Sequence, residues 1–348
     1  MIDRTALLLS DPSACLRYQV LRQILKHPED DPEVKELIEI RLIDPLLTDL
    51  LRLQDPDGSW KMGVMGDPLG GGIIQSTGLA LARIGKLGFG LELDAVQRGA
   101  NFLFSKQLED GSWPLPRDGD KEEGGGYSMI PLQTAFPLRG LAACGYATDL
   151  RCERAYEWLL TQRLADGAWP TGIASGNYGY VAGYRRLAHS RWGCRSNTTA
   201  SLACLVLHPV RRTSSETKRA LDLLLGRETR ERQPLGLETA RLLGAERMRG
   251  FISYFARFDQ AFILSLAWKG GATLEDERIA EMCEYLWDHQ GPYGLWEYQP
   301  KPQVSRWITF DILRTLVGLD ENSQQSNDWQ SLEPRTPFQA YPKRPKRY

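Results

Sequence analysis

Two kinds of helix alternate along the chain when its hydrophobic and polar positions are followed. One kind carries charges along one face, as at residues 33–41 and 277–284. The other kind is apolar on most faces, with small residues where another helix would press close. Nearly all-apolar helices beside amphipathic ones predict an inner and an outer layer. The predicted inner helices lie at residues 18–25, 75–84, 133–141, 197–205, 258–266 and 309–316.

A glutamine followed by a turn and a tryptophan ends most of the predicted outer helices. The copies read LRLQDPDGSW at 51–60, KQLEDGSW at 106–113, TQRLADGAW at 161–169 and HQGPYGLW at 289–296. KRALDLLLGR at 218–227 looks like the same helix in a copy without its Gln and Trp. The tryptophans that end the first three copies, Trp60, Trp113 and Trp169, lie 53 and 56 residues apart. Repetition at this length predicts stacked helical pairs.

The repeated glutamine and tryptophan are expected to have a structural role. A side-chain amide at the end of a helix can satisfy unpaired groups of the turn, and an indole can bury a large apolar area against the next helix. Six inner and about six outer helices would close a ring over residues 1–320, as one domain. Residues 321–348 are polar, Pro-rich and basic, and their composition is typical of a flexible tail.

Composition excludes several classes of partner. The formal net charge of −1 gives no overall field that favours nucleic acid or an acidic membrane. No apolar run reaches the roughly 18 residues that a membrane-spanning helix needs, although peripheral association stays open. The six cysteines are scattered without a CxxC pair. We therefore expect reduced thiols and a cytoplasmic protein.

With these residues in view, the chain resembles the terpenoid cyclase and protein prenyltransferase superfamily, whose QW repeats follow an apolar helix. DPSACLRYQVLRQIL near the start and RWITFDILR near the end look like single-domain, squalene-cyclase-like proteins. The resemblance implies an all-α fold, an (α/α)6 toroid around a central hydrophobic cavity. It also implies a small apolar, isoprenoid-derived ligand.

The chain departs from the catalytic patterns of these families. The Asp-x-Asp-Asp motif with which class II terpene cyclases protonate an alkene does not occur in the sequence. WGCRSNTTASL at 192–202 places Cys194 where a protein prenyltransferase β-subunit holds zinc, but Trp192 and Trp307 fall near its Asp and His ligand positions. We therefore expect no metal or cofactor. Zinc at Cys194, or magnesium accompanying a diphosphate, is the alternative, and a partner protein is left undetermined.

Two carboxylates in apolar surroundings are the candidate catalytic residues. Asp259 in ARFDQAFIL and Asp311 in ITFDILRTL lie at the starts of two inner helices, where the fold would open its cavity. In the functional reading each is an acid or base whose pKa is raised by apolar surroundings. In the alternative reading each is a capping or first-turn carboxylate that stabilises its helix.

Basic and aromatic residues provide the candidate substrate-binding groups. The loop at 184–195 gathers His189, Arg191 and Arg195 ahead of an inner helix, where an anionic head group could bind. Aromatic faces in a dry cavity stabilise carbocations. The alternatives are a solvated loop and ordinary core packing. The candidate aromatic residues are Trp192, Tyr254, Phe258, Trp307 and Phe310.

The leading functional prediction is an enzyme of the terpene cyclase-like or isomerase-like class. It would act by acid/base chemistry on an isoprenoid-derived substrate in the central cavity. The first alternative is a non-catalytic toroid, a scaffold or lipid-binding protein that has lost the family motifs. The second is a divergent prenyltransferase β-like subunit. An interior plugged by the protein's own side chains would favour the first alternative.

Overall fold

The computed structural model describes residues 4–61, 72–114, 130–171, 181, 183–226, 235–246, 250, 253–325 and 329. The regular structure of these residues is helical, with isolated β-bridges but no strand. None of the described helices is both long and apolar enough to cross a membrane. Residues 115–129 and 172–180, Phe251, and most of the predicted tail at 321–348 lie outside the described residues.

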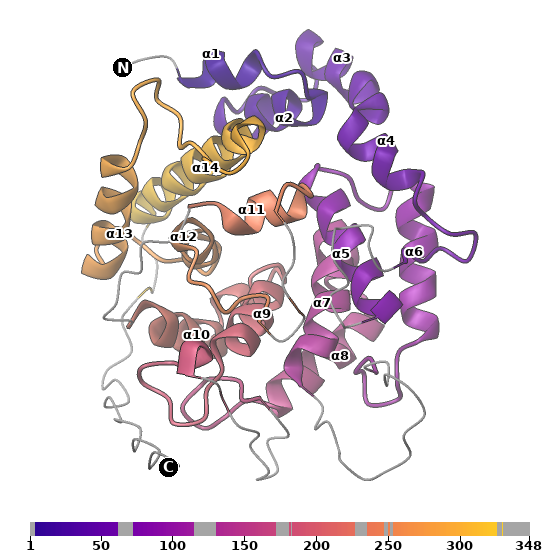
Figure 1. The fold of residues 1–348 in the computed structure, drawn as a ribbon, viewed down its shortest axis with the longest axis vertical. Coiled ribbons are helices and arrows are strands. Elements are labelled where there is room, and N and C mark those ends of the chain that lie inside the picture. The colour runs from indigo at the N-terminus through magenta and orange to yellow at the C-terminus, as the bar shows by residue number, and fades with distance from the viewer. Residues whose placement is uncertain are drawn as a thin grey trace, which may run out of the picture.

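Six helical segments form the inner layer and surround a seventh, short helix, α11 (Leu237–Leu242) (Figure 1). Neighbours in this ring pack directly, as α5 does with α7, α7 with α9, and α12 with α14. The inner segments are α2 (Ala14–Gln19) with η1 (Val20–Ile24), α5 (Gly72–Lys86), α7 (Pro131–Leu141) with η3 (Ala142–Tyr146), α9 (Arg195–Leu205), α12 (Gln260–Lys269) and α14 (Ser305–Gln324).

The amphipathic helices lie outside this ring (Figure 1). They alternate with the inner helices along the chain, which confirms the predicted all-α toroid of two layers. The outer elements are α3 (Pro32–Ile40), η2 (Arg41–Ile43), α4 (Pro45–Leu51), α6 (Asp94–Ser105), α8 (Leu150–Thr161), α10 (Ser215–Leu225) and α13 (Glu277–Asp288). The remaining elements are α1 (Arg4–Leu9), η4 (Gly183–Arg185), η5 (Arg211–Thr213) and η6 (Pro302–Val304).

Hydrogen bonds join the two ends of the ring. The guanidinium of Arg314 in α14 donates to the side chain of Gln23 in η1 at 2.9 Å. On the other side of this segment, Gln19 Nε2 donates to the carbonyl of Lys86 in α5 at 2.9 Å. The first inner segment therefore closes the ring between the last inner helix and the second.

The four repeated tryptophans fasten each outer helix to the next inner helix. Every indole Nε1–H donates to the carbonyl ten residues earlier in its own outer helix, and the tryptophan backbone N–H donates to a threonine hydroxyl near the start of the following inner helix. These two bonds satisfy the polar atoms of a fully buried side chain. The sets are Trp60 with Leu50 and Thr77, Trp113 with Leu103 and Thr134, Trp169 with Leu159 and Thr198, and Trp296 with Leu286 and Thr309.

The glutamines of the first two copies, Gln54 and Gln107, join their turn to the next outer helix, whereas Gln290 bonds only within its own turn. Gln54 Nε2 donates to the carbonyl of Gly58 in its own turn at 3.0 Å and to that of Ala95 in α6 at 2.8 Å. Gln107 repeats the arrangement in the next copy of the repeat. Gly58 has a φ of +88°, and a Cβ there would lie 2.4 Å from the carbonyl oxygen of Arg98. The turn therefore needs glycine for its conformation and for the close approach of α6.

Small residues let two inner helices approach closely, as the sequence predicted. A Cβ on Gly140 of α7 would lie only 2.1 Å from the carbonyl oxygen of Gly78 in α5. We expect Gly140→Ala to lower the free energy of unfolding by about 1–3 kcal/mol, because the two backbones must separate. Urea unfolding followed by circular dichroism measures this change. Gly183→Ala is the matched control, since a Cβ on Gly183 meets nothing within 4 Å; equal losses in both variants would contradict the close packing.

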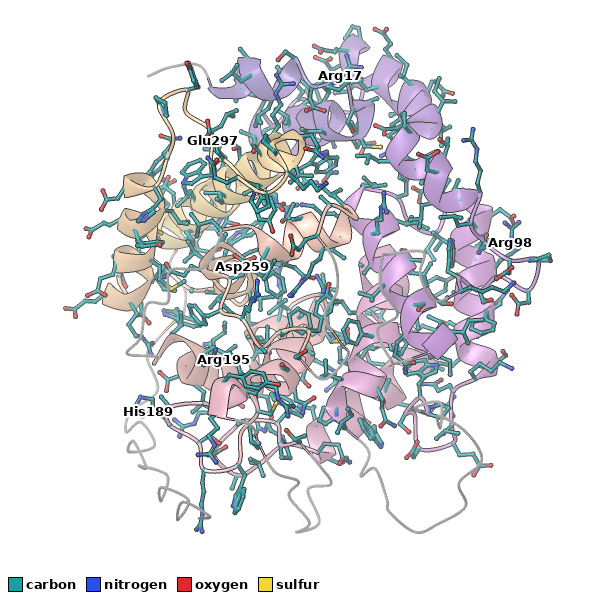
Figure 2. All side chains as sticks on the ribbon, in the orientation of Figure 1. Arg17, Arg98, His189, Arg195, Asp259 and Glu297 are labelled. Carbon is teal, nitrogen blue, oxygen red and sulfur yellow. The ribbon has the colours of Figure 1, made fainter. Side chains whose placement is uncertain are left out.

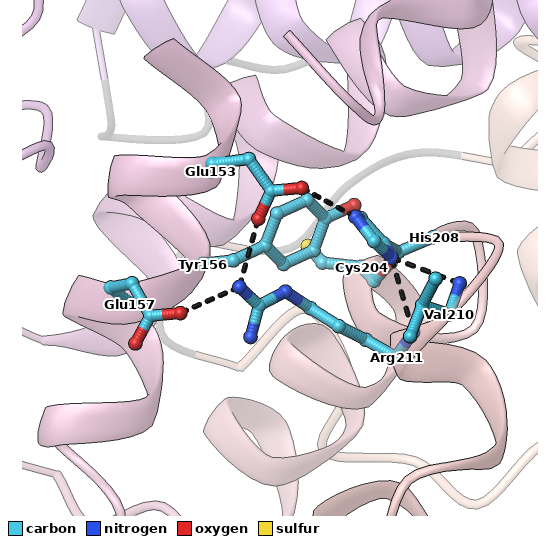
Figure 3. A network of polar contacts seen from close by, with 7 residues as sticks. All are labelled: Glu153, Tyr156, Glu157, Cys204, His208, Val210 and Arg211. Atoms are coloured by element: carbon cyan, nitrogen blue, oxygen red, sulfur yellow. Dashed lines mark hydrogen bonds and ion pairs between the residues drawn. The ribbon is translucent and has the colours of Figure 1, made fainter. Parts of the chain in front are cut away.

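A polar network joins α8 to the segment that follows α9 (Figure 3). His208 is buried, and its Nε2 lies 2.7 Å from a carboxylate oxygen of Glu153, while its Nδ1 accepts the backbone N–H groups of Val210 and Arg211. The Arg211 guanidinium bonds to Glu153 and to Glu157. Both imidazole nitrogens are thus used, Nε2 to hold α8 to the segment after α9 and Nδ1 to shape that segment.

Helix α14 continues past residue 320 to Gln324, and residues 321–324 complete its last turn. The aromatic residues before Asp259 recur at helical spacing, yet Tyr254 and Phe255 lie in a turn. Helix α11 was not predicted at all.

Candidate functional site

Helix α11 lies across the centre of the ring (Figure 1). All six of its residues are buried, although it carries Glu238, Thr239 and Arg241. It packs against α5, α12 and α14, and an ion pair joins it to α7. A helix this short is not stable alone, so its position depends on these contacts.

Asp259 holds the beginnings of two helices together. Its carboxylate is the N-cap of α12, accepting the backbone N–H of Phe262, and it also accepts those of Gly236 and Glu238 at the start of α11, at 3.0 and 2.9 Å. Burial raises its pKa to about 6, while these backbone hydrogen bonds act in the opposite direction. The geometry of Asp259 is that of a structural cap, the alternative reading of its sequence position.

A buried ion pair connects α11 to α7. Arg139 Nη1 lies 2.5 Å from Oε1 of Glu238, and both side chains are almost fully buried. Burial lowers the pKa of the Arg139 guanidinium, but the neighbouring Glu238 carboxylate and the other groups around it raise it by more, so the pKa is higher than usual. The Arg139 guanidinium therefore stays charged in the interior.

Asp311 of α14 is the centre of a second charged cluster, which joins α14 to α5. Its carboxylate pairs with Lys86 and with Arg314, and it accepts the hydroxyl of Thr239 from α11. Burial raises the pKa of Asp311, but the two cations outweigh this effect and hold it below its usual value. Burial lowers the pKa of Lys86 to about 8 despite the same pairing. Asp311 is therefore an ionised partner of two cations, rather than a protonated acid.

Lys269 of α12 lies beside this charged cluster. Its ammonium group forms no hydrogen bond or ion pair with the described residues. Burial lowers its pKa to about 7, and the nearby Arg314 lowers it further. Lys269 borders a cavity of about 80 Å³ at the centre of the ring, together with the paired residues Arg139, Glu238 and Asp311.

The predicted aromatic residues divide between the centre and the rim. Tyr254, Phe258, Trp307 and Phe310 are buried, whereas Trp192 is 37 % exposed in the loop before α9. The protein's own cations lie over several of these rings. Lys86 Nζ is 5.5 Å from the centroids of Trp307 and Phe310, and the Arg241 guanidinium is 4.7 Å from that of Tyr254.

The basic loop lies away from the carboxylates. Figure 2 shows His189 at the lower edge of the molecule, Arg195 nearer the middle and Asp259 at the centre. The Arg195 guanidinium donates to the carbonyl of Ala256 at 2.9 Å, and His189 Nε2 bonds to the carbonyl of Gly226. Arg191 lies over the Trp192 ring, 5.3 Å from its centroid. These residues contact backbone and side chains of the same chain, and they do not join Asp259 and Asp311 in one site.

Cys194 occupies a structural position at the start of α9. It is the residue before the helix, it is fully buried, and its sulfur accepts a contact from Arg185 at 3.8 Å. Across the residues with described positions, no three or more His, Cys, Asp or Glu side chains are grouped as a metal site would need.

The four inner-helix cations are the residues that sequence reasoning missed. Their signal was present, because each stands beside apolar residues of an inner helix: ARIGK, PLRGL, LAWKG and ILRTL. A charge on a fully buried helix needs a partner or a function. The sequence alone could not show that these four positions meet, together with α11, at one point. They are Lys86, Arg139, Lys269 and Arg314.

Comparison with known proteins identifies the family. A family model described as the squalene-hopene cyclase C-terminal domain matches residues 5–184. Squalene–hopene cyclase of Zymomonas mobilis is 27 % identical over 167 residues, 47 % of this chain and 22 % of that protein. Lanosterol synthase of Candida albicans is 32 % identical over 77 residues, 22 % of this chain and 11 % of that protein. This chain thus spans less than a quarter of either curated relative.

Among solved structures, the type II terpene cyclase MstE from Scytonema is 16 % identical, with a TM-score of 0.32, covering 80 % of this chain and 97 % of that one. The family match at residues 5–184 covers more than half of the chain, from α1 through α8. The chain therefore belongs to the squalene-hopene cyclase C-terminal domain family, within the terpenoid cyclase superfamily.

Proposed function

We propose that this protein is a non-cyclising toroid of the family, which serves as a scaffold or binding protein. The observation that carries the proposal is the position of α11, which fills the centre of the ring with buried side chains. Ligand pockets are commonly about 300–1,000 Å³. The central cavity of about 80 Å³ is too small for an isoprenoid chain.

The charges around this cavity also oppose hydrocarbon cyclisation. A carbocation in a cyclase is stabilised by free aromatic faces and by the absence of other cations. Here Lys86 lies over Trp307 and Phe310, and Arg139 lies over Phe262 at 5.4 Å from its centroid. A developing positive charge would meet these fixed cations where it needs electron density.

The surroundings of the two candidate acids support the proposal. Asp311 is held ionised by two cations, and the Asp259 carboxylate, although burial raises its pKa to about 6, is occupied by three backbone N–H groups. The part of the chain that holds α11, Asp259 and Asp311 also follows residue 184, where the family match ends. The activity of the relatives therefore does not extend to this arrangement by similarity alone.

A direct assay tests the proposal. Purified protein incubated with squalene in detergent is expected to yield no cyclised product by gas chromatography and mass spectrometry, compared with heat-denatured protein. A cyclised product formed by the native protein and lost in Asp311→Asn would overturn the proposal. Circular dichroism shows whether that variant keeps its helices.

A terpene cyclase-like enzyme is the second candidate, and the family match over residues 5–184 favours it. In that case α11 leaves the centre to admit an isoprenoid-derived substrate, and Asp259 or Asp311 donates or accepts the proton. Asp259→Asn or Asp311→Asn then abolishes turnover with the helical signal intact. Full activity in both variants would remove these residues from that mechanism.

A further inference from the structure

Cationic side chains from four inner helices converge on the central cavity. They come from α5, α7, α12 and α14, which are far apart in sequence. Three carboxylates share the lining. The cations are Lys86, Arg139, Lys269 and Arg314. The carboxylates are Glu238, Asp259 and Asp311.

Each carboxylate already has partners within the protein. Glu238 pairs with Arg139, Asp311 pairs with Lys86 and Arg314, and Asp259 accepts backbone N–H groups. Lys269 is left without an ion pair to the described residues. The lining thus has one more cation than carboxylates, and the surplus charge faces the cavity. Lys269 is partly buried, with Asp311 as its nearest opposing charge but not an ion-pair partner, so an anion bound beside it would stabilise the site.

The cavity has the size for a small ion. A water molecule takes up about 30 Å³ of liquid. The cavity of about 80 Å³ is therefore comparable with two or three waters, the scale of a carboxylate or a tetrahedral oxyanion. Water also reaches the lining, because the side chains of Asp311 and Arg314 keep 16 % and 15 % of their surface exposed.

We propose that the centre of the ring binds one small oxyanion, with Lys269 as its principal counter-charge and Arg314 and Lys86 beside it. Lysine supplies up to three N–H donors and arginine a planar set of them, so both can bond to oxygen atoms of such an anion. The site is separate from the basic loop of Arg191 and Arg195, which bonds within the chain. The proposal does not depend on whether the protein cyclises a hydrocarbon.

The affinity should depend on pH through Lys269. Its pKa of about 7 means that the amine loses its charge just above neutral pH, and a bound anion would raise that pKa by supplying a counter-charge. Binding therefore takes up a proton above pH 7 and weakens as pH rises, by about tenfold between pH 7 and 8.5. Lys86, with a pKa of about 8, adds to the same trend.

Isothermal titration calorimetry of the full chain with sodium sulfate and with sodium acetate tests the site. Neither anion titrates between pH 7 and 8.5, so a pH dependence reports on the protein. We expect saturable binding of one sulfate or one acetate per chain, and proton uptake seen by comparing two buffers of different ionisation enthalpy. Preference between the two anions tells whether a tetrahedral oxyanion or a carboxylate fits better. Binding of neither would overturn the proposal.

Three variants separate this site from ions bound at the surface. Lys269→Met keeps most of the side-chain volume and should weaken binding at least tenfold, while Lys269→Arg should keep binding and lose most of its pH dependence, because arginine does not titrate in this range. Lys35→Met, the same change at an exposed position on α3, should leave binding unchanged. Unaltered binding in Lys269→Met, with helices intact by circular dichroism, would place the anion elsewhere and overturn the proposal. The squalene assay does not bear on this result, so the two proposals can fail independently.

Discussion

Arg139→Met is expected to lower the free energy of unfolding by about 3–5 kcal/mol. The substitution leaves the Glu238 carboxylate buried without its counter-charge, and a buried charge that loses its partner typically costs this much. Glu238 belongs to α11 and Arg139 to α7, so the loss would also show that α11 is attached to the inside of the ring. Urea unfolding monitored by circular dichroism measures the change.

Two further variants make this result specific. Arg139→Met combined with Glu238→Leu removes both charges and should recover most of the loss, because an apolar pair of similar volume often replaces a buried ion pair without cost. Arg52→Met breaks an exposed pair with Asp49, whose side chains are 77 % and 67 % exposed, and should change stability by less than about 0.5 kcal/mol. Arg139→Met with no loss of stability would contradict the buried ion pair.

Trp169→Ala is expected to destabilise the fold by about 3–5 kcal/mol, the usual cost of truncating a buried tryptophan. Trp169 is fully buried, and its indole N–H donates to the carbonyl of Leu159 at 2.7 Å. The substitution leaves a large cavity between α8 and α9 and removes the indole N–H from the Leu159 carbonyl, which keeps only its bond from the backbone N–H of Gln162. Thermal and urea unfolding measure the loss.

A graded substitution distinguishes packing from hydrogen bonding at this position. Trp169→Phe keeps much of the buried apolar area and removes the indole donor, so it should cost less than Trp169→Ala, about 1–3 kcal/mol for the lost hydrogen bond and a small cavity. Tyr293→Ala, at a residue 71 % exposed, is the control and should change stability by less than about 0.5 kcal/mol. A Trp169→Ala protein as stable as the control would contradict the anchoring role of the repeated tryptophans.

The layers of this fold could be predicted from sequence because their signals are local and repeated. The spacing of apolar residues separates inner from outer helices, and each Gln–turn–Trp unit recurs within one helical pair. The threonines that receive the tryptophan backbone N–H groups were visible in the aligned helix starts, as in QTAFP and NTTAS. Their hydrogen bonds to the tryptophan backbone depend on how the chain folds between each tryptophan and the next inner helix, which sequence spacing does not specify.

The centre of the ring could not be predicted in the same way. Helix α11 has six residues and no copy elsewhere in the repeat, so neither periodicity nor repetition marks it. Asp311 meets Lys86 across 225 residues of sequence, and Arg139 meets Glu238 across 99. Sequence reasoning identified the two aspartates because they stand in apolar runs. It passed over the lysines and arginines in similarly apolar runs, of which Lys86 and Arg314 pair with Asp311 and Arg139 pairs with Glu238.

Helix α11 closes the middle of the ring through charged contacts with the inner helices, and a crystal structure of the ligand-free chain would test this arrangement. We expect α11 inside the ring, the Glu238 carboxylate within hydrogen-bonding distance of Arg139, and Asp311 between Lys86 and Arg314. A continuous empty apolar cavity bounded by the inner helices, with α11 packed outside it, would show that α11 does not close the ring.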